Sequence, residues 1–121
     1  MAWNTNTPRQ YKGYGTRFEG CVVKIKAGEN DAVEASNVAD KSAIGVIKEP
    51  NMRDGEAVSV ACTPGDRVMF VAKSAIAAGD KLKVSTVTAG YVEKTTLETD
   101  AIGIATRPAA NEGDTFEGTL L

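Results

Sequence analysis

The sequence predicts an all-β fold, and three observations lead to that prediction. A turn signal of the form Gly-acid-x-apolar occurs at Gly55, Gly65, Gly79 and Gly113. Glycine adopts a positive φ without steric cost, and Asp can hydrogen-bond its own backbone two residues on, so each copy marks a turn. Short apolar or alternating runs follow these turns, as expected of strands. No segment keeps the apolar spacing of a core helix over three turns.

The strands are clearest in the middle of the chain. Residues 67–72 form an almost continuous apolar run, which predicts a strand covered on both faces. After the turn at Gly79, Leu82 and Val84 alternate with lysines, which predicts a strand with one face in water. Residues 31–41 and 74–78 are compatible only with short helical turns. We expect one compact β-barrel-like or β-tulip-like domain over residues 20–121.

Residues 1–19 are predicted to form an extended N-terminal arm that precedes this domain. The segment lacks both the helix and the strand period, and its Pro and Gly residues favour an extended backbone. Its first eighteen residues contain three basic residues and no acid, although the whole chain has a formal charge of −2. Four of the seven aromatic residues also lie there. A core normally claims large aromatics, so this enrichment indicates a segment that contacts something else.

Three uses of the arm are compatible with these residues. Tyr, Trp and Arg often dominate the energy of protein interfaces, which favours docking on another protein. The arm could instead lie on its own barrel and cover an edge strand. Stacking on nucleic acid is the third reading, but three positive charges are few and the acidic body would repel a polyanion. The residues predicted to bind a partner are Trp3, Arg9, Tyr11, Lys12, Tyr14, Arg17 and Phe18.

From Gly20 onward the chain contains an internal repeat. The two units cover residues of about 20–60 and 79–118, with the strand at 67–72 as the link between them. The clearest match is Ala-Ile-Gly-Val at 43–46 with Ala-Ile-Gly-Ile at 101–104. Two copies are too few for a solenoid, so we expect two similar β units in one body. Gly45 and Gly103 stand at matching positions inside apolar runs, which predicts a bulge or a close approach of backbones there.

Chemically reactive residues are scarce. The chain has no histidine, which removes the commonest general base and the usual transition-metal ligand. Cys21 and Cys62 are expected to be buried free thiols, although the sequence leaves a disulfide open. The acids that follow glycine are explained as turn residues. We therefore predict no catalytic, cofactor-binding or metal-binding residue, and no enzymatic activity.

Length and composition fit one folded domain. The chain has 121 residues, of which 42% are hydrophobic and 25% are charged, as is ordinary for a globular protein. No apolar run is long enough to cross a bilayer, and the start does not read as a signal peptide. We expect a protein that is made in a cytoplasm or carried in an assembly built there.

Several phrases of the sequence resemble the small capsid cement, or head decoration, proteins of tailed bacteriophages. They are Pro-Gly-Asp-Arg-Val at 64–68, Ala-Ile-Ala-Ala-Gly-Asp-Lys-Leu at 75–82, Gly-Tyr-Val at 90–92, Ala-Ile-Gly-Ile-Ala at 101–105, and a Gly-acid turn before the final Leu-Leu. The resemblance covers about residues 55–121, and the repeat extends it to about Gly20. The aromatic and basic arm is not part of the family pattern.

The resemblance implies a non-enzymatic structural protein on the outside of an icosahedral head. Such proteins commonly form trimers and clamp neighbouring major capsid proteins. It further implies a homotrimeric virion protein, assembled in the bacterial cytoplasm, that binds the capsid and neither nucleic acid nor membrane. The alternative from another class is a β-clip-like module that binds carbohydrate, for which Tyr91 is the candidate stacking residue.

Overall fold

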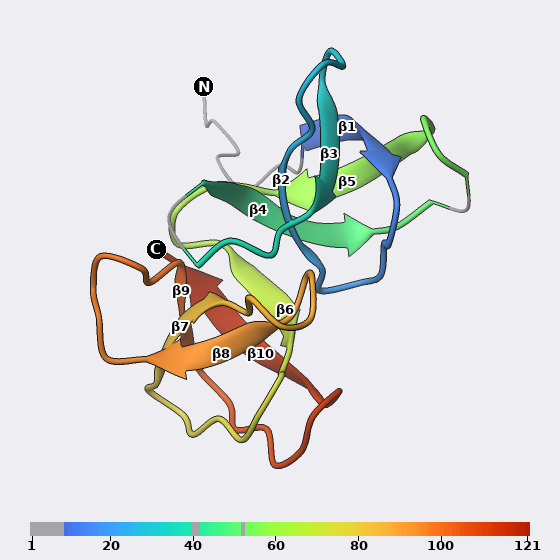
Figure 1. Ribbon diagram of the computed structural model, residues 1–121. Helices are drawn as coiled ribbons and strands as arrows, with labels where there is room; N and C mark the ends of the chain where they lie inside the picture. The colour runs from blue at the N-terminus through green and yellow to red at the C-terminus, as the bar shows by residue number, and fades with distance from the viewer. Residues whose placement is uncertain (1–8, 40–41, 52) are drawn as a thin grey trace, which may run out of the picture.

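The computed structural model describes residues 9–39, 42–51 and 53–121. These residues form ten strands and no helix, which confirms the all-β prediction (Figure 1). The strands are β1 (Arg9–Tyr14), β2 (Val22–Ile25), β3 (Ala32–Ala35), β4 (Ala43–Glu49), β5 (Ala57–Ala61), β6 (Arg67–Val71), β7 (Lys81–Val84), β8 (Val92–Thr95), β9 (Gly103–Ala105) and β10 (Thr115–Leu120). The prediction of a short helical turn in residues 31–41 is wrong for the first part of that segment, because Ala32–Ala35 form β3.

The strands make two five-stranded layers, which lie one above the other in Figure 1. The first is a closed barrel in the order β1-β3-β2-β4-β5. The second is a sheet in the order β6-β10-β9-β7-β8. In the barrel, β1 runs antiparallel to β5 and parallel to β3, so this strand closes the ring.

The two layers repeat the same arrangement, as the sequence predicts. The order β3-β2-β4-β5 in the barrel corresponds to β8-β7-β9-β10 in the second sheet. The registers correspond as well: Val46 pairs with Ala61 in the barrel, and Ile104 pairs with Thr119 in the sheet.

The link predicted at residues 67–72 needs correction. These residues form β6, which pairs with β10 as β1 pairs with β5. An isolated parallel bridge between Ala72 and Val92 corresponds to the parallel pairing of β1 with β3. The second unit therefore begins with β6, and the first begins with β1. The sequence predicted β6 as a strand but placed neither β6 nor β1 in the repeat, because the two strands share no phrase with each other.

The prediction of an extended arm over residues 1–19 is wrong for residues 9–19, which are the part of this segment that the structure describes. Residues 9–14 are a barrel strand, and residues 15–19 form the connection from β1 toward β2. β1 has neither period because Gly13 occupies an inward position, where a Cβ would lie 2.7 Å from the side chain of Val58. A strand with a glycine in an inward position shows no apolar alternation.

The Gly-acid turns share one geometry. The backbone N–H of Asp66, Asp80 and Asp114 donates to the carbonyl three residues earlier. The carboxylate of each Asp accepts the N–H of that same earlier residue, at 2.8 Å for Ala77 and 3.0 Å for Asn111. The sequence predicted a bond to the backbone two residues on, so the turn role is right and the bonded group is wrong.

The core joins the two layers into one body. One buried cluster fills the inside of the barrel around Val58 and Val60. The larger cluster fills the second sheet around Phe70 and Phe116, whose ring centroids are 5.8 Å apart. This larger cluster also includes side chains from barrel strands, such as Val46. The layers are therefore packed through a shared apolar interior.

Gly45 and Gly103 lie at close backbone approaches, as predicted. A Cβ on Gly45 would lie 2.3 Å from the carbonyl oxygen of Ala61. A Cβ on Gly103 would lie 3.0 Å from the carbonyl oxygen of Thr119. Ala61 and Thr119 occupy equivalent positions of β5 and β10, so each glycine permits the same approach in its own layer.

Candidate functional site

The residues predicted to bind a partner fall into two groups. Trp3 lies outside the residues that the structure describes. The others lie on β1 and the connection that follows it. Arg9 is exposed at the start of β1, where it pairs with Val60 of β5. Most of the remaining side chains contact other parts of the same chain.

The outward row of β1 is built from polar side chains. Gln10 donates a hydrogen bond of 2.8 Å to the hydroxyl of Ser59. Lys12 forms an ion pair with Glu29, with an N–O distance of 3.7 Å. The ammonium group of Lys26 lies 5.5 Å from the ring centroid of Tyr14. Lys12 and Tyr14 are only partly buried, so both remain accessible on the barrel surface. Tyr11 packs instead against the barrel core.

Arg17 ties the connection after β1 to the turn before β5. Its guanidinium donates to a carboxylate oxygen of Asp54 at 2.5 Å, and only 10% of its side chain is exposed. The same oxygen accepts the N–H of Gly15 at 3.1 Å. The hydrogen bond from Arg17, followed by that from Gly15, holds the pKa of the Asp54 carboxyl below its usual range. Arg17 therefore has a partner within the fold.

Phe18 contacts the second layer. Its ring meets the ring of Tyr91 edge to face, with centroids 5.6 Å apart and an angle of 83° between the planes. Beside this pair the N–H of Val22 donates to the carbonyl of Gly90 at 3.0 Å, and Gly90 donates to Ser36 at 2.8 Å. Phe18 thus helps to fasten the barrel to the second sheet. Tyr91 lies directly before β8 and packs against the ring of Phe18.

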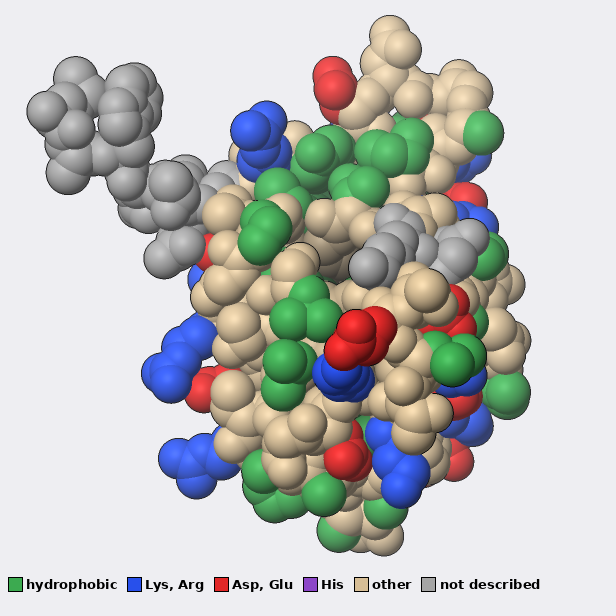
Figure 2. All heavy atoms as spheres, turned by 90° about the vertical axis from the view of Figure 1, so that its left-hand side faces the viewer, with side chains coloured by type: hydrophobic (Ala, Val, Ile, Leu, Met, Phe, Trp, Pro, Cys, Tyr) green, Lys and Arg blue, Asp and Glu red, His purple; other side chains and the backbone are tan. Residues whose placement is uncertain are grey.

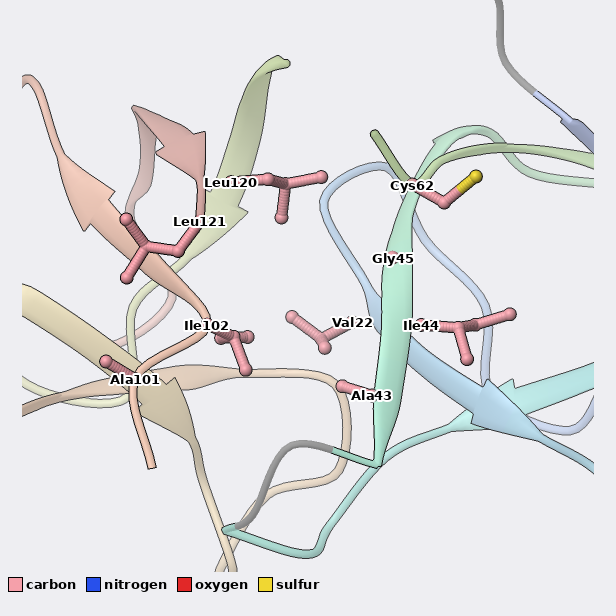
Figure 3. Close-up of a pocket in the computed structure, with 9 residues that line it drawn as sticks. All are labelled: Val22, Ala43, Ile44, Gly45, Cys62, Ala101, Ile102, Leu120 and Leu121. Carbon is pink, nitrogen blue, oxygen red and sulfur yellow. The ribbon is translucent and has the colours of Figure 1, made fainter. Parts of the chain in front are cut away.

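One hollow of the surface lies at the seam between the layers. It is a pocket of about 190 Å³. We call it the seam pocket; it is lined by Val22, Ala43, Ile44, Gly45, Cys62, Ala101, Ile102, Leu120 and Leu121. Figure 3 shows that Val22, Ala43, Ile102 and Leu120 gather around it, whereas the side chains of Ile44 and Cys62 point away. Figure 2 shows hydrophobic side chains around a hollow across the middle of this face.

The seam pocket follows from the repeat. Ala43 at the start of β4 and Ala101 before β9 belong to the same repeated Ala-Ile-Gly phrase. Both phrases border the pocket, so it lies where the two units meet. Leu121 forms part of its rim and is 54% exposed. The sequence prediction did not include these residues. The available signal was the repeat of small residues in two strands that must pack on each other.

The described residues contain two free cysteines, as expected. Cys21 is fully buried, and burial raises the pKa of its thiol to about 12. Cys62 is only half-buried, so the expectation of a buried thiol is right for Cys21 and wrong for Cys62. Among the described residues no group of three His, Cys, Asp or Glu side chains is placed to hold a metal ion. That part of the chain also contains no helix of the length and apolarity needed to cross a membrane.

Comparison with known proteins shows a similarity of fold. No protein-family model matches the sequence, and a search of curated proteins finds no match. The fold is similar to the crystal structure of the head fiber gp8.5 N base of bacteriophage phi29, with a TM-score of 0.66 and 17% sequence identity. The match covers 93% of this chain and 92% of that chain. The similarity shows that the two chains share a fold.

Proposed function

We propose that this chain is a structural, non-enzymatic protein that attaches to the outside of a tailed-phage head and stabilises contacts between major capsid proteins. The observation that carries the proposal is the fold it shares with the phi29 head fiber base over nearly the full length of both chains. The resemblance of its turn phrases to head decoration proteins points to the same class. That resemblance rests on sequence phrases and is independent of the shared fold.

The architecture suits such a role. The two layers share one apolar core. β1 closes the barrel, so the barrel has no free strand edge. A rigid body holds its surface groups at fixed spacing, so weak contacts repeated around a symmetric cluster add up through effective concentration. We include a homotrimer in the proposal, because closed clusters of this kind give each copy the same set of neighbours.

The contacts of the arm residues narrow the surface that we propose for docking. Tyr11, Arg17 and Phe18 hold the fold together through the barrel core, Asp54 and Tyr91. Arg9, Lys12 and Tyr14 are the accessible members of the set on the barrel. We propose that the accessible residues, together with Trp3, contact the capsid. The role that we propose for Tyr11, Arg17 and Phe18 is to hold β1 and the connection after it in position.

Binding to assembled heads tests the proposal. Heads built from the major capsid protein encoded with this chain are mixed with purified protein and sedimented, and the bound fraction is measured. The full chain should co-sediment at saturable occupancy, and Arg9→Glu with Lys12→Glu should bind several-fold more weakly. Lys83→Glu with Lys94→Glu is the matched control, because it makes the same charge change on the second sheet. Full occupancy by the Arg9/Lys12 variant would refute the assignment of the docking surface, and no binding of the full chain would refute the function.

The carbohydrate-binding alternative receives no specific support. Tyr91 is the residue that it would use for stacking on a sugar, and that ring packs edge to face with Phe18. A glycan array probed with the purified protein would reveal such an activity directly.

A further inference from the structure

We propose that the hairpin of β7 and β8 opens away from β6 and the barrel as one unit, while the rest of the chain stays folded. We call this hairpin, residues 81–95, the flap. The barrel holds it closed through residues 18–22, which run from the connection after β1 to the first residue of β2, and we call these residues the clasp. The inference concerns the free protein and stands whether or not the chain binds a phage head.

The second sheet is an incomplete ring. In the barrel, β1 and β3 close the ring by parallel pairing over three residue pairs. The equivalent strands of the second sheet are β6 and β8, and in the described structure they meet at the bridge between Ala72 and Val92. The N–H of Lys73 adds a hydrogen bond of 2.8 Å to the carbonyl of Val92. The flap is therefore joined to β6 at one point, where the barrel has a strand ladder.

The clasp lies against both sides of this gap. On the β6 side, a Cβ on Gly20 would lie 3.0 Å from the carbonyl oxygen of Met69. On the flap side, the N–H of Val22 donates to the carbonyl of Gly90 at 3.0 Å. The ring of Phe18, also in the clasp, packs on a ring of the flap. Contacts with the barrel thus take the place of the missing strand ladder.

The flap is also a distinct unit within its own sheet. β7 and β8 pair with each other over four residue pairs, whereas β7 pairs with β9 over two. The chain enters the flap just after the turn at Gly79, whose φ is +91°. It leaves the flap through residues 96–99, which are exposed. Both ends can therefore turn while the hairpin itself stays paired.

The barrel does not need the flap in order to stay closed. Its ring is complete, and the described members of the inner cluster around Val58 all lie before β6 in the chain. Opening of the flap does expose Leu82, Val84 and Val92, which are fully buried. The open state is therefore rare, and hydrogen exchange is the method that detects such an opening.

Site-resolved amide exchange of the full-length protein tests the proposal. The N–H groups of Val22, Lys73 and Ile102 donate to carbonyls of the flap. We expect these boundary groups to share one protection factor, at least roughly tenfold smaller than that of Lys12 and Gly13, whose acceptors belong to the barrel unit. Opening exposes less surface than unfolding, so the protection of the boundary groups should also depend more weakly on denaturant.

Val58→Ala separates flap opening from unfolding of the whole chain. It weakens the barrel core, which stays folded when the flap opens. It should therefore lower the protection of Lys12 and Gly13 and leave that of Lys73 and Ile102 unchanged.

Gly90→Ala tests the clasp, with Gly28→Ala as the matched control. Both glycines have a φ of +86°, but a Cβ on Gly90 would lie 2.6 Å from the Sγ atom of Cys21, whereas one on Gly28 would meet nothing within 4 Å. Opening relieves the clash at Gly90, so Gly90→Ala should lower the protection of the boundary groups several-fold. Gly28→Ala should leave it unchanged.

Two results would overturn the proposal. One is a single protection factor and a single denaturant dependence for the boundary and barrel groups, because the chain would then open as one cooperative unit. The other is an equal loss of protection in both sets of groups for Val58→Ala.

Discussion

Gly90 and Cys21 pack against each other so closely that no side chain fits between them. A Cβ placed on Gly90 would lie 2.6 Å from the Sγ atom of Cys21. Cys21 precedes β2 of the barrel, and Gly90 lies in the turn before β8 of the second sheet. Gly90 also has a φ of +86°. This contact is part of the fastening between the two layers, beside the rings of Phe18 and Tyr91.

Gly90→Ala should therefore destabilise the protein more than the backbone conformation alone requires. Gly28 has the same φ of +86°, but a Cβ there would meet nothing within 4 Å. We expect Gly28→Ala to cost about 1–2 kcal/mol through the left-handed backbone, and Gly90→Ala to cost a further 1–3 kcal/mol or so through overpacking. Chemical denaturation of both variants measures the difference. Equal losses would show that the layers are not tightly packed at Cys21.

The Arg17–Asp54 pair should make stability depend on pH. The pKa of Asp54 is lowered in the folded protein, mainly by the hydrogen bond from Arg17. The pair therefore stabilises the fold at pH values above the ordinary Asp pKa of about 3.9, and this contribution disappears as the pH falls through the lower folded pKa. The denaturation midpoint of Asp54→Asn should lie below that of the wild type near neutral pH and approach it in strong acid.

Arg17→Met provides the matched variant for this pair. It breaks the same hydrogen bond from the other side, so combining it with Asp54→Asn should add little to either single change at neutral pH. Fully additive losses would contradict the coupling that the geometry indicates.

The two cysteines should differ in reactivity. The thiolate is the reacting form of cysteine, and burial raises the pKa of Cys21 to about 12. Iodoacetamide should modify only Cys62 in the folded protein and both residues after denaturation, as mass spectrometry would show. Cys62→Ser should abolish labelling of the folded protein. Labelling of Cys21 under native conditions would mean that the seam opens readily.

Loss of the Phe18 ring should weaken the fastening between the layers. Phe18→Ala removes the edge-to-face contact with Tyr91. It also removes a partly buried ring that packs against the core of the barrel. We expect a cost of about 2–3 kcal/mol, somewhat less than for a fully buried Phe. Tyr91→Phe keeps the ring and should be nearly neutral. A Phe18→Ala variant as stable as the wild type would show that the contact contributes nothing.

The position of β1 gives a truncation test. A chain that starts at Arg9 retains every strand of the barrel and should unfold cooperatively. A chain that starts at Gly15 lacks β1, which leaves the facing edges of β3 and β5 unpaired. Unpaired edges favour aggregation, so this shorter chain should be insoluble or lack a cooperative transition. Circular dichroism during thermal unfolding distinguishes the two chains.

The sequence revealed the strands that alternate or stay apolar, because their side chains are sorted by burial. It revealed the repeat through the Ala-Ile-Gly phrases, since both units need a glycine where a neighbouring carbonyl approaches. It did not reveal β1, whose inward Gly13 breaks the alternation and whose outward side chains are polar. The basic and aromatic residues around β1 resemble a docking arm in the sequence, because their partners Glu29, Asp54 and Tyr91 are distant along the chain.

The seam pocket was also beyond sequence reasoning. It depends on how two units with the same strand order stack, and no local pattern encodes that stacking. The residues that line it read as ordinary strand positions. The signal that they share is the repeat itself, and it gains meaning only when both copies are seen to border one hollow.

The central claim is that this protein works as an attached structural part of a phage head. The most direct measurement is a cryo-electron microscopy map of heads assembled with and without the chain. The account predicts additional density on the outer surface that fits the stacked barrel and sheet, with the start of β1 facing the major capsid proteins. Heads that show no added density at saturating protein, or density only inside the shell, would contradict it.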